Sequence, residues 1–171
     1  MTALKRGFTL IELLIVMAIL GVLAVVVLVA INPAEQMARA RDTGRISGTQ
    51  QLGRAVQAYF TSNGVLPGSG TAPATTVVGN DLTDSQELSA IPQGITTPAE
   101  PGVCTGGQAI SATWCYKFAA QDFTVYAALY SAQRLNGCGA GATEAYSIFS
   151  STASRGGIFC GGEPAATSVP I

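Results

Sequence analysis

An uncharged, strongly apolar stretch near the N-terminus constrains this sequence more than any other feature. Residues 13–31 form a run of 19 residues without a charged side chain. In an α-helix, at about 1.5 Å per residue, the run extends roughly 28 Å, which is close to the roughly 30 Å hydrocarbon core of a bilayer. The stretch therefore predicts a helix that anchors the chain in a membrane, at least at first. The remainder is rich in Gly, Ser, Thr and Ala, which fits one small, loop-rich domain facing water.

The residues around this stretch do not fit a secretory signal peptide. Such a peptide has an apolar centre of about 7 to 15 residues and small residues at its cleavage point, whereas this stretch is longer and ends without an A-x-A pattern. A plain anchor leaves Glu12 unexplained, because a carboxylate at that depth costs on the order of 3 kcal/mol. Cleavage between Gly7 and Phe8 would create an α-ammonium about 6 Å from Glu12 along a helix. The ammonium of a neighbouring subunit would serve equally well.

The segment at residues 5–14, KRGFTLIELL, resembles the class III signal shared by type IV pilins and type II secretion pseudopilins. In that family a membrane aspartic peptidase, the prepilin peptidase, cleaves after the glycine that corresponds to Gly7. The same enzyme N-methylates the new N-terminal residue, which here is Phe8. The family glutamate that lies within the apolar helix corresponds to Glu12. The resemblance extends to about residue 67 and implies a structural subunit that is processed and then assembled through its N-terminal helix.

The resemblance also implies a pilin fold of the α+β class, in which a long, kinked N-terminal helix packs on a small antiparallel sheet. Its expected parts are a prepilin leader peptide (residues 1–7), a transmembrane and filament-core helix (8–31), an amphipathic half-helix (32–62) and a globular head (63–171). The implied partners are the prepilin peptidase and N-methyltransferase, identical or related pilin subunits, the membrane and an inner-membrane assembly platform. The implied location is the inner (cytoplasmic) membrane, crossed once before assembly, and then an extracellular pilus at the cell surface.

The half-helix after the anchor is expected to pack its apolar stripe on the head. Pro33 removes one helical donor and should kink the helix, but apolar residues at helical spacing continue through residues 34–62. Its charged pairs, such as Asp42 with Arg45, are interpreted as a solvated face or as an interface between subunits. Four glycines weaken the helix, and they either permit close approach of helices in a filament or are simply tolerated. They are Gly21, Gly44, Gly48 and Gly53.

Beyond the half-helix, the sequence predicts a long loop followed by four short strands. Residues 66–107 are rich in Pro, Gly, Thr and Ser, with one short helix expected near residues 84–90. Alternating or β-branched runs then predict strands that are separated by turns. The predicted strands are residues 113–118, 123–130, 145–150 and 157–160, and the tail from residue 162 should be loose.

Four cysteines in the C-terminal half predict two disulfides in an oxidising compartment. A zinc site is the competing interpretation, but the sequence has no CxxC pair and no histidine. Four cysteines permit three pairings. We favour Cys104 with Cys115 and Cys138 with Cys160, because neighbours in sequence close short loops beside the predicted strands.

Several functional classes are disfavoured by what the sequence lacks. With no histidine and with its cysteines paired, the chain offers no Ser–His or Cys–His arrangement, so we expect neither an enzyme nor a cofactor site. Calcium binding by Asp81, Asp84 and Glu87 is less favoured than a capped polar helix, because the EF-hand spacing is missing. The formal net charge of −1 gives no bulk signal for nucleic-acid binding.

The resemblance leaves three structural roles open. The chain could be a pilin of a surface fibre, a pseudopilin of a type II secretion system, or a minor tip subunit for adhesion or DNA uptake. Two disulfides and an exterior rich in Gly, Ser and Thr favour the surface fibre. Only three basic residues lie beyond residue 66, which gives little support to DNA capture. They are Lys117, Arg134 and Arg155.

Overall fold

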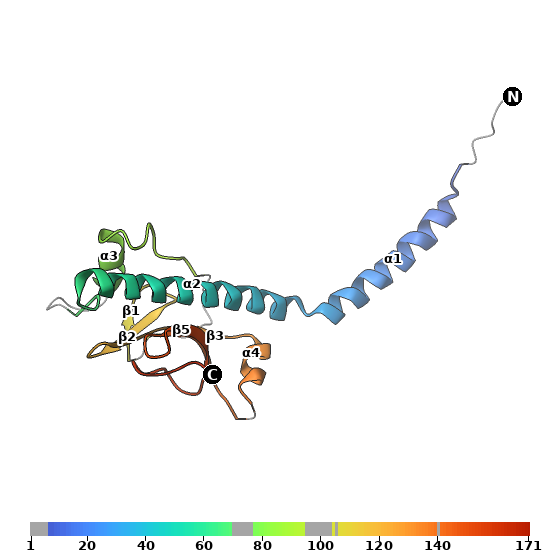
Figure 1. Ribbon diagram of the computed structural model, residues 1–171. Helices are drawn as coiled ribbons and strands as arrows, with labels where there is room; N and C mark the ends of the chain where they lie inside the picture. The colour runs from blue at the N-terminus through green and yellow to red at the C-terminus, as the bar shows by residue number, and fades with distance from the viewer. Residues whose placement is uncertain (1–6, 70–76, 95–103, 105, 140) are drawn as a thin grey trace. The chain divides into compact units, whose positions relative to one another are not determined.

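The computed structural model describes residues 7–69, 77–94, 104, 106–139 and 141–171 (Figure 1). Most of the predicted leader and part of the predicted long loop therefore lie outside the described residues. The chain divides into two compact units, Met1–Met37 and Ala38–Ile171. We describe each unit by itself. The second unit, called the head below, contains residues 38–62 in addition to the predicted head at residues 63–171.

The first unit contains helix α1 (Leu10–Ile31) and the beginning of helix α2 (Pro33–Asn63). The kink expected at Pro33 is a break between these two helices. Asn32 ends α1 in the left-handed conformation, with φ of 45°, and its side-chain oxygen accepts a hydrogen bond from the Glu35 amide. Proline suits the first position of a helix because its missing N–H has no partner there in any case. The Asn32–Pro33 pair thus both ends one helix and begins the next.

The second unit is built on a five-stranded antiparallel sheet (Figure 1). Each strand pairs with the next one along the chain, in the order β1-β2-β3-β4-β5. The four predicted strands are present with small shifts at their ends, and the two-residue strand β1 was not predicted. The strands are β1 (Gln108–Ala109), β2 (Cys115–Ala119), β3 (Asp122–Leu129), β4 (Ala145–Ser150) and β5 (Arg155–Cys160).

Helix α2 packs on the sheet through an apolar stripe, as expected, and through two glycines. Leu52 and Val56 are fully buried in the main core cluster. A Cβ atom built on Gly48 would overlap the Trp114 ring, and one on Gly53 would overlap Phe149. These glycines therefore admit the head's own aromatic rings. Neither of the two roles considered for them, approach between helices of a filament or simple tolerance, is the one the structure shows.

Asp42 and Arg45 form a buried attachment of α2 to the sheet, which corrects the prediction of a solvated or intersubunit pair. Asp42 is only 1% exposed, and its carboxylate accepts hydrogen bonds from the backbone N–H groups of Tyr130 and Ser131 at 3.0 and 2.9 Å. Arg45 donates to the Ala128 carbonyl at 3.0 Å, and its guanidinium lies over the Tyr130 ring. Both charges thus satisfy groups at the end of β3, and helical spacing alone could not reveal these distant partners.

Helix α3 (Val77–Asp84) lies earlier in the chain than the short helix expected at residues 84–90. Its sequence, VVGNDLTD, is poor in strong helix formers, so propensity gives no signal for it. Burial stabilises it instead, because Val78 and Leu82 are fully buried in the main core cluster. The Asp81 carboxylate accepts a hydrogen bond from the Gly68 amide at 2.8 Å. A second short helix, α4 (Ala132–Gly137), was also not predicted.

The C-terminal tail is held against the sheet, so the expectation of a loose tail from residue 162 was wrong. The Thr124 hydroxyl donates to the Ala166 carbonyl at 2.8 Å, and the Ile171 amide donates to the Ile158 carbonyl at 2.9 Å. Glu163 accepts hydrogen bonds from the Tyr126 hydroxyl and the Gly106 amide. The tail has no periodic pattern, and these hydrogen bonds to distant residues attach it to the sheet.

Glu163 also forms an ion pair with Lys117 at 3.2 Å. Burial by itself acts to raise the pKa of Glu163, but the hydrogen bonds from Tyr126 and Gly106, together with Lys117, lower it below its ordinary value. Burial and the Glu163 hydrogen bond raise the pKa of Tyr126, so the phenol stays protonated as the donor. This network connects the tail to strands β2 and β3.

Two disulfides cross-link the head, and they join the pairs favoured from the sequence. Cys104 is bonded to Cys115 and Cys138 to Cys160, each with a Cα–Cα separation of 5.5 Å. The first attaches the segment before β1 to the start of β2, and the second attaches the end of α4 to the end of β5. Both therefore fix loops at the ends of strands.

Candidate functional site

The residues predicted for processing and assembly lie at the start of α1. They are Gly7, Phe8 and Glu12. Gly7 and Phe8 are exposed and precede the helix, which begins at Leu10. The expectation of a helix from residue 8 is therefore corrected by two residues. The 6 Å spacing between Phe8 and Glu12, which assumed a helix throughout, does not apply to this structure. Lys5 and Arg6, which precede the predicted cleavage point, lie outside the described residues.

Glu12 takes part in a capping box with Thr9, a partner that the sequence reasoning missed. The Thr9 hydroxyl accepts a hydrogen bond from the Glu12 amide at 3.3 Å. The Glu12 carboxylate in turn accepts from the Thr9 hydroxyl at 3.1 Å and from the Thr9 amide at 3.4 Å. The spacing T-x-x-E before an apolar run is the sequence signal of this motif. The cap satisfies N–H groups that the first turn of a helix otherwise leaves without partners.

Helix α1 presents an exposed apolar surface. None of its 22 residues is buried, and by length and composition it is apolar enough to cross a membrane. Leu10, for example, is 82% exposed and Val29 is 79% exposed. Water does not favour so large a contiguous apolar surface, so a surface of this size marks a site of contact with lipid or protein.

The described residues offer no arrangement for metal binding. They contain no group of three or more His, Cys, Asp or Glu side chains that could hold an ion. In the alternative calcium set, the Asp81 carboxylate is bound to the Gly68 amide and the Glu87 carboxylate to the Ser62 hydroxyl. These contacts give the acidic side chains a structural role.

Comparison with known proteins gives this N-terminal segment a family. Residues 3–28 match the family model described as the prokaryotic N-terminal methylation motif. The chain is 33% identical over 108 residues to the fimbrial protein EcpC of Eikenella corrodens, a match that covers 61% of this chain and 69% of that protein. No solved structure matches the chain.

Two Neisseria proteins are similar over a shorter region. The chain is 42% identical over 72 residues to a fimbrial protein of Neisseria meningitidis serogroup B, covering 42% of this chain and 41% of that protein. It is 40% identical over 72 residues to the type IV major pilin protein PilE of Neisseria gonorrhoeae, covering 42% of each. These two matches thus span about two fifths of the relatives' length.

An α+β head that follows an exposed apolar helix with an N-terminal methylation motif defines the class of pilin-like fimbrial proteins. The chain belongs to the type IV pilin family, whose members are structural proteins and not enzymes.

Proposed function

We propose that this chain is a structural subunit of a type IV pilus-like extracellular filament. The observation that supports this most directly is the methylation motif at residues 3–28, which lies at the start of a helix without a single buried residue. An exposed apolar helix has two chemically suitable environments, the lipid bilayer before assembly and a bundle of identical helices afterwards. The same surface serves both environments, because neither contains water.

The proposed processing begins with cleavage between Gly7 and Phe8 by a prepilin peptidase. Phe8 lies outside α1 and is 79% exposed, so the peptide bond before it is accessible and needs no helix unwinding. Cleavage leaves Phe8 as the new N-terminus, one residue before the Thr9 cap, and N-methylation would modify that amino group. In this proposal the subunit crosses the cytoplasmic membrane once, and an inner-membrane platform adds it to the filament.

Glu12 is proposed to direct assembly through the Phe8 ammonium of a neighbouring subunit. In the isolated subunit the Glu12 carboxylate is held by the Thr9 amide and hydroxyl. In a medium of low dielectric constant an ammonium is a stronger partner for a carboxylate than a neutral donor is. A neighbour displaced by one helical turn would leave both charges unpaired, and this cost would select one axial register.

Intact-mass measurement on the membrane-bound protein and on sheared surface filaments tests the proposal. We expect one mature species in both fractions that begins at Phe8 and carries one additional methyl group. A chain that retains Lys5 and Arg6, or that begins after Ala30, contradicts the proposed processing. Cells that process the chain but form no filaments contradict the proposed function.

A further inference from the structure

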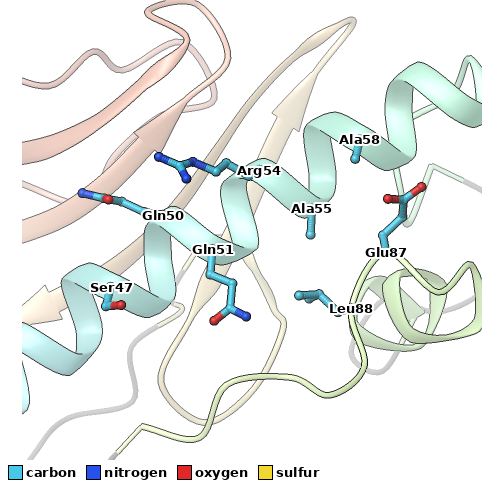
Figure 2. A pocket seen from close by; sticks show the side chains of 8 residues that line it. All are labelled: Ser47, Gln50, Gln51, Arg54, Ala55, Ala58, Glu87 and Leu88. Carbon is cyan, nitrogen blue, oxygen red and sulfur yellow. The ribbon is translucent and has the colours of Figure 1, made fainter.

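The exposed face of α2 lies between two cavities on the head. One cavity, of about 530 Å³, is bounded on its far side by Glu87 and Leu88 (Figure 2). The other, of about 320 Å³, extends from α2 to the beginning of β5 and is called the arginine cavity below. Gln50 and Arg54 line both of them. The side chains of this helix face are therefore accessible from two sides.

The arginine cavity combines two positive charges with neutral polar groups. Its polar side chains are those of Arg54, Arg155, Gln50, Gln57 and Ser154, and no carboxylate is among the residues that line it. The two elements meet closely here, because a Cβ on Gly156 would lie 2.8 Å from Cγ of Gln50. A guanidinium group supplies several N–H donors, and a carboxamide adds those of its NH2 group. The cavity is thus suited to an anionic ligand with more than one acceptor oxygen.

Arg54 has donors available for such a ligand. Its guanidinium forms no hydrogen bond or ion pair with any residue that the structure describes. It lies in the middle of α2, so it cannot compensate the negative end of that helix. Figure 2 shows its side chain extending toward Gln50 and away from Glu87. Arg155 donates one hydrogen bond, to the Pro170 carbonyl at 3.2 Å, which leaves further donors on its guanidinium.

A complementary carboxylate is present on another part of the same head. Asp84 is exposed at the last position of α3, where the negative end of a helix disfavours a carboxylate. It accepts no hydrogen bond from the part of the chain that the structure describes. The other described carboxylates of the second unit all accept at least one. These are Asp42, Asp81, Glu87, Asp122, Glu144 and Glu163.

We propose that the arginine cavity binds the Asp84 carboxylate of a second copy of this chain. The contact joins two different surfaces of identical subunits, so it is heterologous and repeats along a filament. The inference rests on the proposed function, because it assigns a contact between the heads of neighbouring subunits to the proposed polymer. It is independent of Glu12, which lies in the first unit. Arg54 is the principal donor, and Arg155 adds charge.

Charge reversal in the full-length chain, expressed in cells, tests the contact. Arg54→Asp and Asp84→Arg should each lower the yield of sheared filaments at least about fivefold, because like charges then face each other. Asp84→Arg places a favourable cation at the end of α3, so its loss of filaments cannot come from a destabilised helix. The double variant Arg54→Asp, Asp84→Arg should recover at least about half of the wild-type yield, because the pair is restored in reverse.

Arg134→Asp is the matched control, because it makes the same charge change at α4, outside the arginine cavity. It should leave the filament yield unchanged, and every variant should keep the wild-type amount of oxidised, membrane-bound subunit. Wild-type yields from both single reversals overturn this inference alone. A double variant no better than the singles, or an equal loss with Arg134→Asp, also overturns it. Absence of filaments from the wild-type chain overturns the proposed function together with this inference.

Discussion

Helix α1 exposes its apolar side chains, whereas the head buries its largest ones. No residue of α1 is buried, whereas in the head Trp114, Tyr116, Phe123 and Tyr126 are at most 1% exposed. Burial of apolar surface stabilises by about 25 cal/mol per Å². The head obtains this free energy when the single chain folds, whereas α1 leaves its apolar side chains exposed. The head is therefore complete as a folded unit, and α1 is not.

Carboxylates in the two regions also differ: the one in α1 has a local partner, and the one in the head has distant partners. Glu12 of α1 is exposed, and among the described residues its carboxylate is held only by Thr9, three residues away. Asp42 of the head is buried and is held by backbone groups 88 and 89 residues away. A local cap can be exchanged for another partner without unfolding anything. A buried carboxylate that joins distant segments cannot be released without loss of tertiary structure.

The strongest test of this comparison is to remove the charge of Glu12. Glu12→Gln should lower the yield of sheared filaments at least about tenfold, because it removes the partner of an ammonium in a medium of low dielectric constant. The quantity of processed subunit in the membrane should not change, since α1 becomes more apolar. Thr9→Val is the matched control: it weakens the local cap, which is worth about 1 kcal/mol, and keeps the carboxylate. Equal losses from both variants would show that Glu12 acts only as a cap.

The disulfides should stabilise the head and leave α1 unaffected. Replacing Cys138 and Cys160 together by serine should lower the free energy of unfolding by about 3 kcal/mol in a loop-entropy model. The corresponding change at Cys104 and Cys115 should cost about 0.6 kcal/mol less, because its loop is half as long, with a sequence separation of 11 against 22. Denaturation of the full-length protein in detergent, followed by Trp114 fluorescence, measures both. A non-reducing peptide map that shows crossed pairs would contradict this assignment.

The smallest expected effect is the difference in stability between alanine substitutions at two glycines of α2. Gly53→Ala should destabilise the head by about 1 to 3 kcal/mol, because the new methyl group overlaps Phe149. Gly44→Ala meets no atom within 4 Å and should stabilise α2 by up to about 1 kcal/mol through helix propensity. The same denaturation experiment measures both changes. Equal stabilisation by the two variants would show that α2 does not pack against Phe149 as described.

The sequence by itself determined the features that depend on neighbouring residues. The apolar run predicted α1, because a helix satisfies its own backbone groups and needs only a suitable length and composition. Alternating residues predicted β2 to β5, and turn residues marked the connection between β2 and β3, but α4 occupies part of the turn expected between β3 and β4. The T-x-x-E spacing of Thr9 and Glu12 is also a local signal, that of a capping box. Sequence neighbours among the cysteines predicted the two pairs that the structure contains.

Only the tertiary structure decided the features that depend on distant partners. Asp42 and Arg45 had the spacing of a surface pair, but the end of β3 supplies their buried partners. Helix α3 forms despite weak propensity because the core buries Val78 and Leu82. The tail is attached by hydrogen bonds with the Thr124 hydroxyl, which donates, and the Ile158 carbonyl, which accepts. No periodic pattern in the sequence indicates these bonds. In each case the stabilising free energy comes from contacts with residues far away in the sequence. A local sequence pattern reflects only interactions between residues close in sequence.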